Sequence, residues 1–165
     1  MTWTLSTLKT AVKDYCETSE STFDTQLTTF IQEAEERILK NVELPDFRKN
    51  VTGTSTASST YLSTPTDFLS PYAVFDENTF ILAPTPDSNY TFELHYKHRP
   101  ASLTAGADSG TTWLSTNAPD ALLYGTLVEA ATFLKVPEEV AQYEQRFVSA
   151  TSSLKRLGEG YGARD

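Results

Sequence analysis

Apolar residues between Asn117 and Lys135 recur at intervals of three and four, which predicts a helix. Asn117 can cap free backbone N–H groups at its start, and Pro119 and Asp120 suit the first helical turn. The apolar positions form two adjoining stripes, so we expect this helix to be buried on several sides. The stripes comprise Leu123, Leu127, Ala130 and Leu134, and Tyr124, Val128 and Ala131.

A second helix is predicted to begin at Pro137, because proline disfavours helical geometry in the preceding residue and is well tolerated in a first turn. Glu138 and Glu139 suit the positive end of this helix, and Gly158 is a natural stop. Its apolar residues form one stripe, so the two segments together predict a helical hairpin. The stripe comprises Val140, Tyr143, Phe147, Ala150, Leu154 and Leu157.

Two further helices are predicted near the start of the chain, from about Leu5 to Cys16 and from about Asp24 to Asn41. Ser21 and Asp24 offer capping oxygens to the longer one. The apolar positions are Leu5, Leu8, Val12 and Tyr15 in the first helix, and Leu27, Phe30, Ile31, Ala34, Ile38 and Val42 in or just after the second.

Glu35 lies at the margin of the apolar face of the longer helix. One interpretation is an exposed glutamate on an amphipathic helix. The other is a partly buried carboxylate held by an arginine, since a buried charge without a partner is costly. Arg99 and Arg146 are the candidate partners, and the sequence favours neither interpretation.

The segment from Asn50 to Pro100 has the character of β-structure. Residues 51–62 are rich in threonine and serine, which allows either a hairpin or a solvated loop. Strands are predicted at 72–76, 79–82 and 90–99. The last of these alternates strictly, with Tyr90, Phe92, Leu94 and Tyr96 on one side and Thr91, Glu93, His95, Lys97 and Arg99 on the other. A small antiparallel sheet with one solvent-exposed face follows.

These elements predict a single α+β domain over residues 1–165: a bundle of about four helices with a small antiparallel β-sheet inserted between the second and third. The helical body comprises 4–44 and 117–157, and the β-rich insertion 49–100. Residues 101–112 are expected to form a flexible loop with almost nothing to bury, which Trp113 pins against the base of the hairpin. The tail, 158–165, is expected to be disordered alone and to fold onto a partner through Tyr161.

Charge and composition exclude several classes of function. The net charge is −9 and no basic run occurs, which argues against a surface that grips nucleic acid. No apolar run approaches the roughly 20 residues needed to cross a bilayer, so a soluble protein without a membrane partner is expected. The single cysteine, Cys16, cannot form an internal disulfide and is interpreted as a packing residue.

Signals for enzymatic chemistry are scarce. The chain has no glycine-rich phosphate loop, no paired-cysteine metal motif and no nucleophile elbow. His95 and His98 are three apart on a predicted strand and therefore face opposite sides, which disfavours a shared metal. We therefore assign no catalytic, cofactor-binding or metal-binding residue, and expect a protein that works by shape and contact.

Four stretches of the chain carry a family resemblance. They read FIQEAEERI at 30–38, LSTPTDFL at 62–69, ELHYKHRPASL at 93–103, and TWL at 112–114 followed by PDALLYG and LVEAATFL up to Leu134. In this order and spacing they resemble the head-to-tail adaptor proteins, or neck connectors, of tailed bacteriophages. The departure is at Leu62 and Pro65, which are adjacent in the family's LP.DFL pattern and separated by two residues here. The resemblance covers roughly residues 23–157.

The resemblance implies a structural virion protein of the neck, assembled in the host cytoplasm and not an enzyme. It implies a homo-oligomeric ring, usually of twelve copies, beneath the portal and above a stopper, nozzle or tail protein. DNA would pass during ejection without sequence-specific binding, and an acidic channel would keep the duplex from sticking.

The resemblance also assigns roles to residues. The family's C-terminal segment commonly reaches the portal, which gives a portal-docking tail here. A structural role is assigned to five residues within the matching stretches. The tail residues are Gly158, Glu159, Gly160, Tyr161, Gly162, Ala163, Arg164 and Asp165, and the structural residues are Glu35, Arg37, Trp113, Tyr124 and Gly125.

Two rival functions stay open at this point. The first is a tail-associated binding module whose aromatic strand, Tyr90 to Tyr96, holds a ligand such as a glycan. The second is a small hydrolase that uses His95 or His98.

Overall fold

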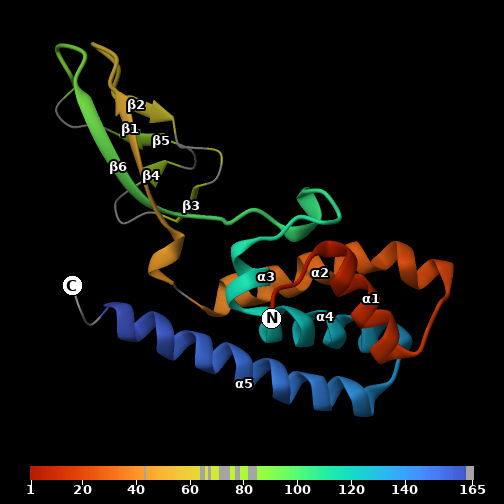
Figure 1. Ribbon diagram of the computed structural model, residues 1–165. Helices are drawn as coiled ribbons and strands as arrows, with labels where there is room; N and C mark the ends of the chain where they lie inside the picture. The colour runs from red at the N-terminus through yellow and green to blue at the C-terminus, as the bar shows by residue number, and fades with distance from the viewer. Residues whose placement is uncertain are drawn as a thin grey trace. The chain divides into compact units, whose positions relative to one another are not determined.

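The computed structural model describes residues 1–42, 44–63, 66, 68–70, 75–76, 79–81 and 85–162 (Figure 1). The chain forms two compact units. The helical unit comprises residues 1–44 and 101–165, and the β-unit comprises residues 45–100. The strands thus follow the second helix and precede the third, so the predicted α+β fold with an inserted β-region is confirmed.

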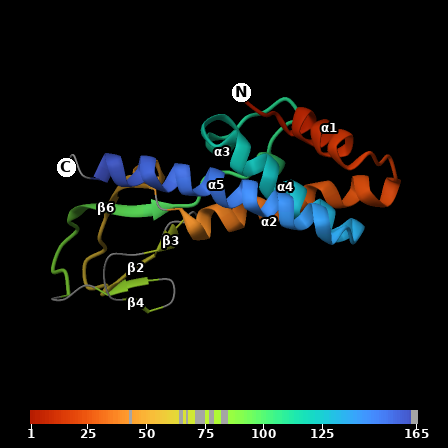
Figure 2. The same ribbon diagram turned by 90° about the horizontal axis from the view of Figure 1, so that it is seen from below.

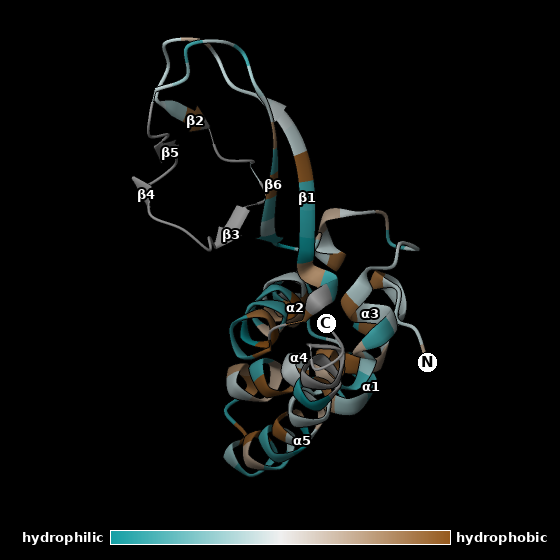
Figure 3. Cartoon of the chain, turned by 90° about the vertical axis from the view of Figure 1, so that its left-hand side faces the viewer, coloured by the Kyte–Doolittle hydropathy of each residue, from teal (hydrophilic) through white to brown (hydrophobic). Residues whose placement is uncertain are grey.

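The helical unit is built around one central helix. Its helices are α1 (Leu5–Cys16), α2 (Ser21–Asn41), α3 (Trp113–Asn117), α4 (Pro119–Leu134) and α5 (Pro137–Gly162). Helix α4 contacts each of the other four, as Figures 1 and 2 show. Apolar and polar residues occupy different sides of the longer helices around it (Figure 3). The predicted hairpin is confirmed, because α4 and α5 pack along each other.

Helix α4 is buried on several sides, as its two apolar stripes predict. Thr126 is the one polar side chain among its buried positions, and its hydroxyl donates to the carbonyl of Leu122 at 2.8 Å. An internal acceptor removes the cost of burying that hydroxyl. The buried residues are Ala121, Leu122, Leu123, Gly125, Thr126, Leu127, Val128, Ala130 and Ala131.

Two helix starts differ from the sequence-based prediction. Helix α2 begins at Ser21, three residues before the predicted start, and its N-cap, Glu20, makes no side-chain capping hydrogen bond. Asp24, a predicted cap, instead pairs with Lys13 of α1 at 2.6 Å. The earlier start places Phe23, with no exposed surface, in the core.

The helix predicted to begin at Asn117 is preceded by a separate short one. Asn117 is the last residue of α3, and its side-chain amide donates to the Trp113 carbonyl at 3.1 Å. Ala118 joins the two helices, and Pro119 occupies the first position of α4 as expected. The predicted capping role of Asn117 is therefore wrong.

Helix α5 continues past its predicted stop. Gly158 was expected to end it, yet the helix extends to Gly162, and no described glycine has a positive φ. A glycine ends a helix most readily from the left-handed conformation, and within a helix it costs only about 1 kcal/mol. The disorder expected from Gly158 onward is therefore wrong for 158–162, and residues 163–165 lie outside the described part of the chain.

The described residues of the β-unit form two three-stranded antiparallel sheets where one sheet was predicted. The first has the order β1-β6-β3 and the second β2-β5-β4. The strands are β1 (Arg48–Thr54), β2 (Tyr61–Ser63), β3 (Phe68–Ser70), β4 (Phe75–Asp76), β5 (Thr79–Ile81) and β6 (Thr91–His98). For residues 51–62, the sequence allowed either a hairpin or a solvated loop. In the structure this segment contains the end of β1, a loop and the start of β2. The strands predicted at 72–76 and 79–82 fall partly outside the described residues.

Strand β6 alternates as predicted. Tyr96 is buried and Phe92 and Leu94 are half-buried, whereas Glu93 and His95 are exposed. Phe92 lies opposite Gly53 of β1, where an added Cβ would come within 2.5 Å of the phenyl ring. The aromatic ring therefore occupies the space that only glycine leaves open.

The connection from 101 to 112 is more ordered than predicted. It contains a 3-10 turn, η2 (Leu103–Ala105), whose Leu103 is 2% exposed. The carbonyl of Asp108 accepts a hydrogen bond from the Ser6 N–H at 3.0 Å, which ties the connection to α1. The expectation of a segment with almost nothing to bury is therefore wrong.

Candidate functional site

Glu35 is a buried carboxylate. Its side chain is in the core of the helical unit, at 4% exposure, and accepts a hydrogen bond from the backbone N–H of Leu103 at 2.8 Å. The burial that the second interpretation predicted is therefore confirmed, and the backbone of η2 is one partner of the carboxylate. Arg146, one of the proposed partners, instead lies against Tyr124.

Replacing Glu35 by alanine is expected to lower the free energy of unfolding by about 1–3 kcal/mol, because the buried Leu103 N–H loses its acceptor. Urea denaturation measures the change. Glu33→Ala on the exposed side of the same helix is the matched control and should stay within about 0.5 kcal/mol of the parent chain. Equal effects of the two substitutions would contradict the role of Glu35.

Arg37 joins three helices. Its guanidinium donates to Glu129 of α4 at 3.1 Å and to both carboxylate oxygens of Glu144 of α5 at 2.8 Å. It also lies 4.7 Å from the centre of the Phe147 ring. A bidentate carboxylate and an aromatic face suit the planar guanidinium, so this contact fixes α2 against the α4–α5 hairpin.

The carboxylates around Arg37 outnumber it. Burial raises the pKa of the Glu129 carboxyl, Arg37 lowers it and Glu33 raises it again, with a net upward shift. Burial lowers the pKa of Arg37, but hydrogen bonds and charge from Glu144 and Glu129 raise it by more. The guanidinium thus stays charged, while Glu129 is held closer to neutrality than an exposed glutamate.

Gly125 lies where three helices meet. A Cβ at this position would come 2.9 Å from the Ala34 Cβ of α2 and 3.1 Å from the Phe147 ring of α5. Contacts under 3.0 Å between such atoms force a neighbour to move. The structural role that the resemblance assigns to Gly125 therefore has a plain physical basis: it lets α2 and α5 approach α4 closely.

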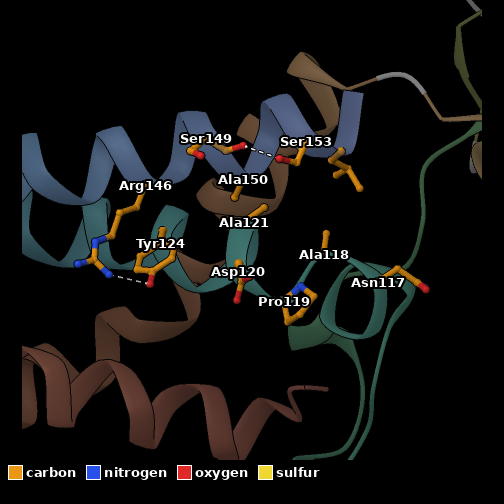
Figure 4. Close-up of a pocket in the computed structure, with 11 residues that line it drawn as sticks. Asn117, Ala118, Pro119, Asp120, Ala121, Tyr124, Arg146, Ser149, Ala150 and Ser153 are labelled. Carbon is orange, nitrogen blue, oxygen red and sulfur yellow. Dashed lines mark hydrogen bonds between the residues drawn. The ribbon is translucent and has the colours of Figure 1, made fainter. Parts of the chain in front are cut away.

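Tyr124 and Arg146 border an open groove between the start of α4 and the middle of α5 (Figure 4). Arg146 donates to the Tyr124 hydroxyl at 3.0 Å, and its guanidinium lies 5.4 Å from the ring centre. The groove has a volume of about 430 Å³ and small residues such as Ala121 and Ala150 among its lining. Its lining includes the ionisable side chains of Asp120, Tyr124 and Arg146 but neither histidine nor cysteine.

The two tryptophans of the helical unit have different roles. Trp113 opens α3, which Thr112 caps, and is partly buried. Trp3, which the sequence reasoning missed, is 7% exposed and its indole N–H donates to the Pro119 carbonyl at 3.1 Å. The N-terminal segment is thereby fixed against the start of α4.

The two histidines do not share a site. The ring of His98 contacts the Phe47 carbonyl at 3.0 Å, whereas His95 is exposed and 3.7 Å from Glu93. The aromatic stripe of β6 does not form an open platform either, because Tyr96 is 2% exposed. Among the described residues, no group of three or more histidine, cysteine or acidic side chains is placed to hold a metal ion.

Cys16 is half-buried, and burial, assisted by the charge of Glu139, raises the pKa of its thiol to about 11. Such a thiol is mostly protonated at neutral pH and therefore a poor nucleophile. This agrees with its interpretation as a packing residue.

The model of a family described as SU10 adaptor protein matches residues 70–164, which is more than half of the chain. The matched segment includes β6, η2 and the whole α3–α4–α5 region. No curated protein matches the chain. None of the helices, within the described residues, is both long enough and apolar enough to span a bilayer.

Proposed function

Because the chain belongs to the SU10 adaptor protein family, a family of structural phage proteins, we propose that it is the subunit of a ring joining the capsid portal to the tail. The family match is the observation that carries this proposal, and it confirms the resemblance to tailed-phage adaptors. The ring, usually of twelve copies in such adaptors, contacts the portal on one side and a stopper, nozzle or tail protein on the other.

The packing of the helical unit supports a structural role. Apolar side chains of α1, α2, α4 and α5 are used to hold these helices together, and Arg37 and Gly125 fix their spacing. The unit is therefore a rigid building block. Its open groove and exposed aromatic residues remain for contacts with other chains.

The net charge of −9 supports passage of DNA without retention. Affinity for duplex DNA comes largely from lysine and arginine on phosphates, and an acidic wall repels the backbone instead. The proposed ring therefore acts as a conduit, and neither base recognition nor catalysis is part of its function.

The end of the chain is the proposed portal-docking segment. Residues 158–162 form the last turns of α5, and three of these five residues are glycines. Each glycine weakens a helix by about 1 kcal/mol relative to alanine, so these turns can rearrange on a partner at small cost. Tyr161 is the aromatic residue of this proposed docking segment.

Analytical ultracentrifugation with and without the portal protein tests this function. The chain alone is expected to sediment as monomers or a heterogeneous mixture, and to co-sediment with the portal at micromolar concentrations. Removal of residues 158–165 is expected to weaken co-sedimentation by about tenfold or more, because the docking segment is lost. Thermal unfolding should change little, since the buried stripe of α5 ends at Leu154 in the described side chains.

Two results would count against the proposal. Absence of co-sedimentation of the full chain would contradict the adaptor function itself. Undiminished co-sedimentation of the shortened chain would contradict the docking role of residues 158–165 and leave the adaptor function standing.

A further inference from the structure

Arg146 is an exposed cation of the helical unit that lies against the ring of the half-buried Tyr124. Its partner is the Tyr124 hydroxyl, and no carboxylate lies within ion-pair distance of it in the described part of the chain. The hydrogen bond with Tyr124, followed by smaller electrostatic contributions from Tyr15 and Tyr143, raises the pKa of Arg146. Tyr15 is 49% exposed. We call Tyr15, Tyr124 and Arg146 the arginine face.

A second surface of the same unit has the opposite character. Glu129 and Glu144 pair with Arg37, and Glu33, one turn before Arg37 on α2, interacts with Glu129, so three carboxylates gather near this guanidinium. Phe133, one turn beyond Glu129 on α4, is 41% exposed although its ring also contacts Phe23 and Phe30. We call Glu33, Glu129, Phe133 and Glu144 the carboxylate face.

The two faces lie on opposite sides of the α4–α5 hairpin. Glu144 and Arg146 are two residues apart on α5, which turns them roughly 200° from each other. Tyr124 and Phe133 are nine residues apart on α4, which is about two and a half turns and again reverses the direction. One face is thus exposed on each side of the same pair of helices.

Opposed and complementary faces are what a closed ring requires. In a ring, each copy contacts its two neighbours through two different surfaces, and the rotation between copies closes the assembly. The arginine face provides a cation that pairs with no carboxylate of the described residues, together with aromatic rings, and the carboxylate face provides carboxylates together with an aromatic ring. Arginine and aromatic residues are also the types enriched at the centres of protein interfaces.

We propose that a second copy of this chain docks on the arginine face through its carboxylate face, with Arg146 of one copy against the Glu33–Glu129 region of the next. The inference rests on the proposed function, because it specifies how the subunits of the ring meet. It gives each subunit one donor face and one acceptor face, so the contact propagates from copy to copy. It also gives Arg146 a carboxylate partner, which none of the described residues of its own chain provides.

Charge reversal tests the contact. Sedimentation velocity at low salt, from micromolar to about millimolar chain, should show reversible association of the parent protein. Arg146→Glu and Glu33→Lys, both at exposed positions, should each weaken it by about tenfold or more, because like charges then face each other. An equimolar mixture of the two variants should associate again, since each variant supplies the charge that the other now requires. A chain that carries both Arg146→Glu and Glu33→Lys should also associate, because its two faces have exchanged charges.

Arg48→Glu is the matched control. Like Arg146→Glu, it replaces an arginine by a glutamate, here at an exposed position of β1 in the β-unit, so these two variants change the net charge equally. The self-association constant of this control should stay within about threefold of that of the parent chain. Far-UV circular dichroism and thermal midpoints verify that every variant is folded.

The outcomes separate this inference from the proposed function. The inference is overturned by a parent chain that stays monomeric throughout, by unchanged association of both charge variants, by equal weakening in the control, or by failure of the mixture to recover. In each case, co-sedimentation of the parent chain with the portal would leave the adaptor function intact. Loss of that co-sedimentation would speak against the function itself.

Discussion

Gly125→Val is expected to lower the free energy of unfolding of the helical unit by about 3 kcal/mol, at the upper end of overpacking effects. Even the Cβ of the new side chain would approach Ala34 to 2.9 Å and the Phe147 ring to 3.1 Å. The two further methyl groups have no space unless α2 or α5 moves away from α4. Such a movement would also disturb the contacts of Arg37, which span the same three helices.

Urea denaturation followed by circular dichroism measures this change. Gly106→Val is the matched control, because a Cβ at Gly106 meets no atom within 4 Å, and it should change stability by no more than about 0.5 kcal/mol. Gly125→Ala should give an intermediate loss, since a single carbon is added and alanine favours the helix. A valine variant as stable as the parent chain would show that the helices are not held at this spacing.

Phe23→Ala is expected to cost about 3–5 kcal/mol, the range for loss of a fully buried aromatic side chain. Phe23 has no exposed surface, and its ring centre lies 5.8 Å from that of Phe30 and 6.2 Å from that of Phe133. Its removal would leave a cavity between α2 and the end of α4, which neighbouring side chains can fill only in part.

Thermal or urea unfolding measures the effect, with Phe133→Ala as the comparison. Phe133 belongs to the same aromatic cluster but is 41% exposed, so its truncation should cost less than half as much. Equal losses for the two substitutions would contradict the assignment of Phe23 to the core and Phe133 to the surface.

Periodicity predicted the parts of the fold that one strong apolar stripe defines. The bounds of α1 agree with the prediction, and α4 and α5 form the expected hairpin. The extra first turn of α2 was missed because Glu20 caps it without a side-chain hydrogen bond. A helix start without that signal cannot be found from residue types. For the same reason, the sequence did not predict that Phe23 is buried in the core.

Isolated apolar residues were harder to predict than stripes. Leu103 stands alone in a polar segment, yet it is buried and its N–H reaches Glu35. Trp3 likewise precedes the first helix and bonds to Pro119, more than a hundred residues away. Such contacts depend on tertiary distances that local patterns do not contain. The buried Glu35 was one usable signal, since a carboxylate in the core requires a donor.

The candidate site was predictable in its residues but not in its connections. The resemblance identified Arg37, Tyr124 and Gly125, but nothing local pairs Arg37 with Glu129 and Glu144. A hint existed in α4, where Glu129 interrupts an otherwise apolar helix and therefore needs a cation nearby. The separation of β-strands into two sheets also went unpredicted, because strands of two or three residues leave no periodic pattern.

Electron microscopy of the chain assembled with its portal protein tests the central claim most directly. We expect two-dimensional class averages to show a symmetric ring of this chain around a central opening, stacked on the portal. Class averages in which the chain binds as isolated, unsymmetrical copies, or fails to surround any opening, would contradict its role as a ring-forming adaptor.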